Sequence, residues 1–182
     1  ENFETLTISN TVRFSEKCLF GHKNFKTITF SNVQYLEEYA FANTSFDQSL
    51  VIPESVKSIK TGCFAHSSWT GDLTINANAE EIDYSVFSGA KFGGSKLTIT
   101  NVKTIGARAF ENCFSTSIQL SIQTIQIIGS MAFYGLNIDK ITVPYSTSLI
   151  GRAAFTGVTS KELVIDANFE KTNFTWFEGT NK

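Results

Sequence analysis

The chain has 182 residues, 42% of them hydrophobic, and its 15 basic and 17 acidic residues give a formal net charge of -2. This size can bury a continuous core, and we expect one domain over residues 1–182. The charge balance excludes the basic surface of a nucleic-acid-binding protein, and no apolar run approaches the ~18 residues of a membrane-spanning helix. Because the chain starts with Glu1 and lacks a signal-type basic region, we expect a mature product or a piece of a longer protein.

Pairs of apolar residues, separated by one mostly polar residue, recur along the whole chain. The pairs are Leu6/Ile8, Ile28/Phe30, Leu50/Ile52, Leu73/Ile75, Leu97/Ile99, Leu120/Ile122, Ile141/Val143 and Leu163/Ile165. This period-two alternation predicts eight short β-strands with one apolar face each. No two-residue turn connects them, so the strands must return to the same side each time. The pattern therefore predicts a parallel sheet with one coil per repeat.

A phenylalanine, called the anchor below, stands between successive pairs. The anchors are Phe20, Phe41, Phe64, Phe87, Phe110, Phe133, Phe155 and Phe177. Leu or Ile stands five residues before the anchor in the middle six copies, whereas the first and last copies have Ser15 and Thr172. Each anchor is predicted to fill the wide part of its coil. Its segment has room for only one or two helical turns, entered in three copies through a glycine that tolerates a sharp bend.

These repeats resemble the BspA-type leucine-rich repeats, also called the Treponema pallidum type. The run Leu50-Val51-Ile52-Pro53-Glu54-Ser55-Val56-Lys57-Ser58-Ile59 carries the signature Ile-Pro-x-x-Val-x-x-Ile, and residues 141–155 carry a second close copy. The resemblance covers essentially the whole chain. It implies an α/β-type leucine-rich repeat solenoid of about eight coils of roughly 22–23 residues. The parallel β-sheet would form the concave face, with short strands and helical turns on the other side.

The strand residues that face away from the core form the candidate partner-binding site. They are Thr7, Thr29, Val51, Thr74, Lys96, Thr98, Gln119, Ser121, Lys140, Thr142, Glu162 and Val164. Faces of this kind are common binding surfaces in solenoid proteins. Threonine also has a high strand propensity and solvates an exposed face, so a purely structural role fits the same row.

Reactive side chains are few and do not cluster in the repeat register. Cys18, Cys63 and Cys113 belong to alternate coils, roughly 10 Å apart at strand spacing, whereas a disulfide needs Cα atoms within about 7 Å. We expect Cys18 and Cys63 to be buried beside their anchors and Cys113 to be partly exposed. His22 and His66 each follow an anchor by two residues and are expected in solvated turns. No metal site, cofactor site or catalytic constellation is predicted.

The resemblance implies a non-catalytic adhesion or protein-binding module of a surface or secreted protein. Its partners would be host extracellular-matrix or cell-surface proteins, with no nucleic acid and no membrane insertion. The sequons at Asn43 and Asn173 agree with secretion. The alternative is a structural spacer, or a solenoid that stacks end to end because neither terminus shows a clear polar cap.

Overall fold

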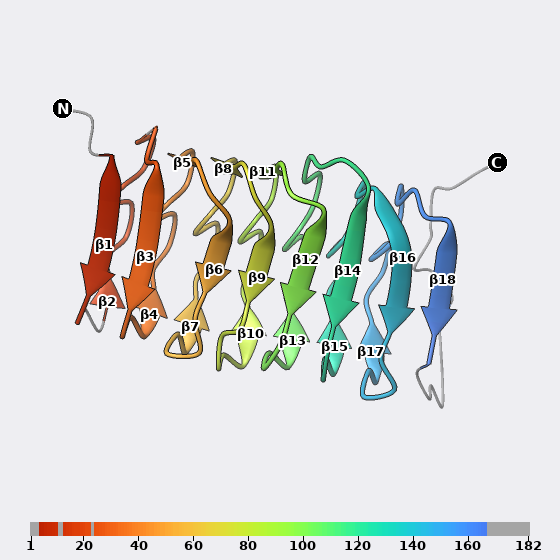
Figure 1. The fold of residues 1–182 in the computed structure, drawn as a ribbon. Helices are drawn as coiled ribbons and strands as arrows, with labels where there is room; N and C mark the ends of the chain where they lie inside the picture. The colour runs from red at the N-terminus through yellow and green to blue at the C-terminus, as the bar shows by residue number, and fades with distance from the viewer. Residues whose placement is uncertain (1–3, 11–12, 23, 167–182) are drawn as a thin grey trace.

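The computed structural model describes residues 4–10, 13–22 and 24–166, and the regular structure there consists of short strands joined by turns. The coils follow one another along the molecule, and each contributes strands to as many as three parallel sheets (Figure 1). Strands of seven successive coils and the major strand of an eighth lie within these residues. The parallel solenoid predicted from the repeats is confirmed. No membrane-spanning helix is found in this part of the chain.

The major face is built from the strands predicted from the apolar pairs. They are β1 (Thr5–Ser9), β3 (Thr27–Ser31), β6 (Leu50–Ile52), β9 (Leu73–Ile75), β12 (Lys96–Ile99), β14 (Ile118–Ile122), β16 (Ile138–Val143) and β18 (Glu162–Ile165). Equivalent residues of adjacent coils pair in parallel, as Leu73 does with Leu97. The hydrogen-bonded ladder is interrupted between β3 and β6, where the Gln48 side chain donates to the Ile28 carbonyl at 2.6 Å. The concavity of this face stays a prediction.

Two further faces complete each coil. The second face comprises β2 (Arg13–Phe14), β4 (Tyr35–Leu36), β7 (Ser58–Ile59), β10 (Glu81–Ile82), β13 (Thr104–Ile105), β15 (Ile127–Ile128) and β17 (Leu149–Ile150). The third face comprises β5 (Ser45–Phe46), β8 (Ser68–Trp69) and β11 (Lys91–Phe92). Single parallel bridges from Phe25 to Phe46 and from Lys91 to Phe114 extend the third face over the first five coils.

The helical turns expected around each anchor are not formed in the described coils. In the fifth coil the N–H of Ala109 donates to Gly106 three residues back, whereas the N–H of Phe110 donates to Ala132 of the next coil. The residues two before and two after this anchor, Arg108 and Asn112, have φ of 57° and 52°. A left-handed residue on either side of the anchor breaks the run of right-handed residues that a helix requires. The anchor segments are therefore tight turns hydrogen-bonded between coils.

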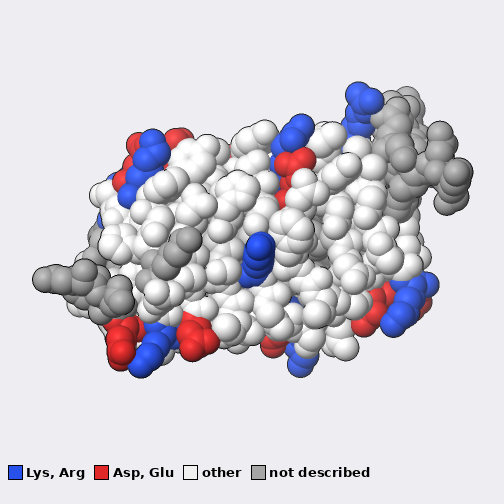
Figure 2. Space-filling view, turned by 90° about the horizontal axis from the view of Figure 1, so that it is seen from above, with Lys and Arg blue, Asp and Glu red and all other residues white. Residues whose placement is uncertain are grey.

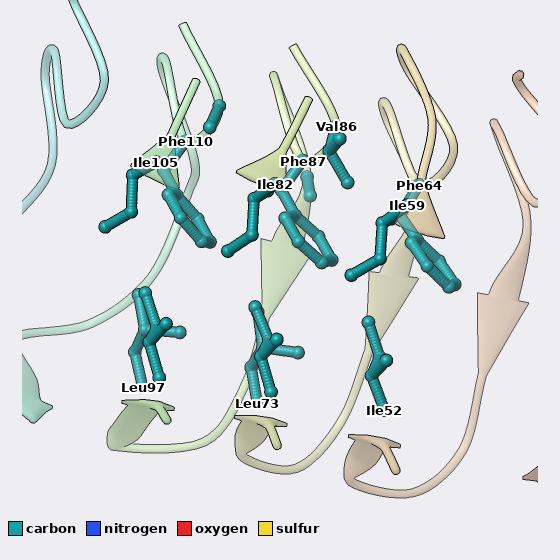
Figure 3. Packing of buried hydrophobic residues seen from close by; sticks show 14 of the residues in the cluster. Ile52, Ile59, Phe64, Leu73, Ile82, Val86, Phe87, Leu97, Ile105 and Phe110 are labelled. Carbon is teal, nitrogen blue, oxygen red and sulfur yellow. The ribbon is translucent and has the colours of Figure 1, made fainter. Parts of the chain in front are cut away.

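A column of stacked anchor rings runs through the core. The six anchors from Phe41 to Phe155 are 0% exposed. The ring centroids of Phe64 and Phe87 are 5.3 Å apart, and those of Phe87 and Phe110 are 5.1 Å apart. Figure 3 shows the same arrangement in three adjacent coils, with each ring beside the isoleucine five residues before it and above a residue of the major face. The prediction that these anchors are core residues is confirmed.

The anchor of the first coil is displaced by one residue from its predicted position. Phe20 is 52% exposed, so its assignment as an anchor is wrong. Leu19 takes the place instead, because its N–H donates to Ala40 as the N–H of Phe41 donates to Cys63. The predicted last anchor, Phe177, lies outside the described residues.

Phe14 explains why a smaller anchor suffices in the first coil. It pairs with Leu36 on the second face, so Phe14, and not Ser15, stands five residues before the anchor. The Phe14 ring stacks on that of Phe41 with centroids 4.8 Å apart. The ring that covers the end of the aromatic column thus comes from a different position of the repeat, and a leucine completes the packing.

The corrected register is tested by two neighbouring substitutions. Leu19→Ala is expected to lower the free energy of unfolding by about 1–2 kcal/mol, less than for a fully buried leucine because Leu19 is only partly buried. Phe20→Ala is expected to change it by about 0.5 kcal/mol or less. Urea denaturation of the two variants measures both values. A greater loss for Phe20→Ala would restore the predicted register.

Candidate binding surfaces

The strand face consists of the outward side chains of the major strands and contains every predicted site residue. Thr74, Thr98 and Val164 are half-buried, and the others are exposed. They form two parallel rows. In the first row Thr74 pairs with Val51 on one side and with Thr98 on the other. Because Thr7 and Thr29 belong to the separate β1–β3 ladder, this row is not one continuous ladder.

The second row of the strand face carries its charges. Gln119 pairs with Lys96 and with Lys140, and Lys140 pairs with Glu162. The Nζ atom of Lys140 is 3.0 Å from Oε1 of Glu162, an exposed ion pair. Lys96 makes no ion pair within residues 4–10, 13–22 and 24–166, and its backbone N–H donates to Asp72 at 3.0 Å. A partner would therefore meet one unpaired ammonium group, that of Lys96, and one ammonium group, that of Lys140, whose charge Glu162 neutralises.

A second surface, which the sequence analysis did not identify, is a groove of about 760 Å³ over the third face. Each of the first five coils contributes three consecutive residues to its lining, at 24–26, 45–47, 68–70, 91–93 and 114–116. The middle residue is aromatic in four coils, where Phe25, Phe46, Trp69 and Phe92 are 2–3% exposed. The signal was present in the sequence as Phe46, Trp69 and Phe92, each five residues after its anchor.

The predicted environments of two cysteines are wrong. Cys18 is exposed, because it lies in the terminal coil, and Cys113 is buried. The Cys113 thiol donates to the Phe87 carbonyl with a sulfur–oxygen distance of 3.0 Å. Cys63 is buried as expected, and all three thiols are free. Burial raises the pKa of the Cys63 and Cys113 thiols well above their ordinary value. These two thiols therefore stay neutral and inert near neutral pH.

One of the three thiols is expected to react with a thiol reagent in the native protein, and all three after unfolding.

The buried thiols also make stability depend on pH. Because their pKa is higher in the folded chain, their contribution is complete below about pH 9 and is lost as the pH rises further, when unfolded thiols ionise. The loss is about 1.4 kcal/mol per pH unit for each thiol. The free energy of unfolding, measured by urea denaturation between pH 8 and 10, should fall less steeply with pH in Cys63→Ala/Cys113→Ala than in the wild type. An equal dependence on pH in both proteins would contradict this prediction.

The histidines and the first sequon are also placed. His22 and His66 are exposed in turns, as predicted, and the described residues contain no group of three His, Cys, Asp or Glu that could hold a metal ion. Asn43 is half-buried with φ of 58°, and the buried hydroxyl of Thr44 donates to the Phe41 carbonyl. Glycosylation of Asn43 stays a prediction, and Asn173 lies outside the described residues.

Comparison with known proteins agrees with this architecture. A family model for the BspA type leucine rich repeat region matches residues 1–115 and 103–182, with 6 copies. A leucine-rich repeat protein from Eubacterium ventriosum has a similar solved structure, with a TM-score of 0.71 and 23% sequence identity over 86% of this chain. The match covers 43% of that protein, so this chain spans less than half its length. No curated protein matches the chain.

Proposed function

Because the chain belongs to the BspA-type leucine-rich repeat family, we propose that it is a non-catalytic protein-binding module of a surface or secreted protein. The strand face binds extracellular-matrix or cell-surface proteins of a host. The observation that carries this proposal is the open strand face itself. In β3, β6, β9 and β12 its side chains alternate with buried ones, as in Leu50, Val51 and Ile52 of β6, so the core holds them in a fixed array.

The dimensions of the strand face suit a protein partner. Eight strands about 4.8 Å apart span roughly 34 Å. A typical stable interface covers about 800 Å² on each partner, and a face of this length can supply that area. The exposed side chains combine threonines, an apolar Val51 that is 52% exposed, and the lysines of the second row. Such a mixture of apolar and polar groups is typical of non-obligate interfaces.

A charge reversal on the second row tests the strand face. Lys96→Glu/Lys140→Glu is expected to weaken binding to an immobilised extracellular-matrix protein at least about tenfold, because it removes both ammonium groups and places a new carboxylate at position 140 beside that of Glu162. Stability should change little, since both side chains are exposed. Surface plasmon resonance against a panel of purified matrix proteins gives the affinities.

The matched control is Lys57→Glu/Lys103→Glu, which changes the net charge equally on the side of the molecule that carries the second face. Both lysines are exposed there. Equal weakening by the two double variants would assign the effect to net charge and would exclude the strand face as the site.

End-to-end assembly is the second candidate, and the first coil favours it. Leu6, Phe14 and Leu19 are only partly buried there, and β1 has a neighbour on one side only in the described sheets. An edge of this kind can pair with another chain. Light scattering over a wide concentration range would show growing particles if the solenoids stack, and a constant monomer mass if they do not.

A further inference from the structure

We propose that the groove on the third face is a second binding site, whose ligand is a short, uncharged oligosaccharide. This inference goes beyond the proposed capture of proteins by the strand face, because the two surfaces share no residue. The groove crosses five coils and is therefore about 20 Å long at the strand spacing. Its volume of about 760 Å³ lies within the range of small-molecule sites.

The groove has a floor of nearly buried aromatic rings, one exposed ring at Phe114, and neutral polar groups. The polar groups are the amide of Asn24 and the hydroxyls of Ser45, Ser68, Thr70, Ser115 and Thr116. Charged side chains are few, namely Lys26, Asp47 and Lys91. Figure 2 looks down on this side of the molecule and shows charged residues mainly near its borders, with a basic side chain near the middle. A sugar presents apolar C–H faces edged by hydroxyls, which is the chemistry that rings and neutral polar groups complement.

Two polar groups in the lining lack partners. Among the described residues, the buried side-chain atoms without a hydrogen-bond partner are Ser55 Oγ, Trp69 Nε1 and Ser115 Oγ. Trp69 and Ser115 line the groove, and Trp69 is only 3% exposed. A buried polar group without a partner is destabilising. A sugar hydroxyl both donates and accepts, so a ligand lying in the groove would satisfy the indole N–H and the serine hydroxyl once a side-chain shift uncovers them.

The backbone of the third face is already paired, which argues against a peptide that adds as a strand. The N–H of Gly93 donates to the Trp69 carbonyl at 2.9 Å, and the N–H of Phe92 donates to the Phe114 carbonyl at 3.1 Å. Strand addition needs free backbone groups at a sheet edge. Recognition in this groove therefore depends on side chains.

Phe114 supplies an exposed aromatic platform at one end of the groove. Its backbone bridges to that of Lys91, which places it at the outward position that Ser45 and Ser68 occupy in earlier coils. The ring is 60% exposed. The Nζ atom of Lys91 lies 5.4 Å from the ring centroid, a cation–π contact that restrains the ring. A ring held in this way is preorganised for stacking against a sugar.

The test measures oligosaccharide binding by calorimetry and by the fluorescence of Trp69. The chain has two tryptophans, so Trp176→Phe leaves Trp69 as the only one. The probes are cellohexaose, chitohexaose, maltohexaose and mannohexaose, with an uncharged apolar peptide as a comparison. We expect at least one oligosaccharide to bind and to change the emission of Trp69. Phe114→Ala should then weaken its Kd about tenfold or more, as truncation of an aromatic anchor does.

Phe20→Ala is the matched control, because Phe20 is 52% exposed and lies outside the groove; its Kd should equal that of the parent. Lys96→Glu/Lys140→Glu should also leave oligosaccharide binding unchanged, which separates this site from the strand face. The proposal is overturned if none of the four oligosaccharides binds at millimolar concentration, if the two phenylalanine variants weaken binding equally, or if only the peptide binds.

Discussion

Phe87→Ala is expected to lower the free energy of unfolding by about 3–5 kcal/mol. The Phe87 ring is 0% exposed and stacks between those of Phe64 and Phe110, at 5.3 and 5.1 Å. Neither neighbour can move into the space left by the ring, because each is held by its own coil. The substitution therefore leaves a cavity and removes two aromatic contacts in the middle of the solenoid. Urea denaturation should show the loss as a lower midpoint at an unchanged slope.

Phe114→Ala serves as the control for Phe87→Ala, because it removes the same side chain from a position that is 60% exposed. Its expected effect is about 0.5 kcal/mol or less. If Phe87→Ala cost less than about 1 kcal/mol, the stacked column would not be the main support of the core.

Gly106→Ala is expected to cost about 1–3 kcal/mol, because the added methyl group meets the backbone of the preceding coil. A Cβ atom at Gly106 would lie 2.5 Å from the carbonyl oxygen of Ile82 and 2.9 Å from the carbonyl carbon of Asp83. Backbone atoms cannot rotate away as a flexible side chain can. For a chain of this size the melting temperature should fall by about 2–4 °C per kcal/mol.

The control is Lys60→Ala. Lys60 stands four residues before its anchor, as Gly106 does, and already carries a Cβ atom. Its exposed ammonium group lies 4.0 Å from Asp83, a contact worth about 1 kcal/mol at most. Calorimetry of the two variants compares them directly. If the melting temperature of Gly106→Ala were no lower than that of Lys60→Ala, the coils could separate at this point without a loss of stability.

The strand positions and most of the core could be predicted from the sequence, because both follow from periodic burial. Each apolar pair, such as Leu73/Ile75, lies in a major strand, and every member except the exposed Ile165 is buried or partly buried. The register of the first coil could not be predicted, because the pattern prefers the aromatic Phe20 over Leu19. The Phe14 ring stacks on Phe41, so the smaller Leu19 takes the anchor position, partly buried, and Phe20 is exposed.

The turns and the groove depend on contacts that a repeat pattern does not encode. Arg108 and Met131 adopt positive φ, 57° for each, although neither residue type favours it. Hydrogen bonds from Arg108 to Ser130 and from Met131 to Arg152 of the following coils hold this conformation. The aromatic residues beneath the groove could be found from their spacing to the anchors. The exposure of Phe114 could not, because it depends on the pairing of Phe114 with Lys91, which no local sequence pattern indicates.

Lysine modification of the protein bound to a matrix protein, followed by mass spectrometry, tests most directly the claim that function resides in the strand face. Lys96 and Lys140 lie on that face, whereas Lys57 and Lys103 lie on the side of the second face. We expect the partner to slow acetylation of Lys96 and Lys140 about tenfold and to leave Lys57 and Lys103 unchanged. Protection of Lys57 and Lys103 with free reaction of Lys96 and Lys140 would contradict the account.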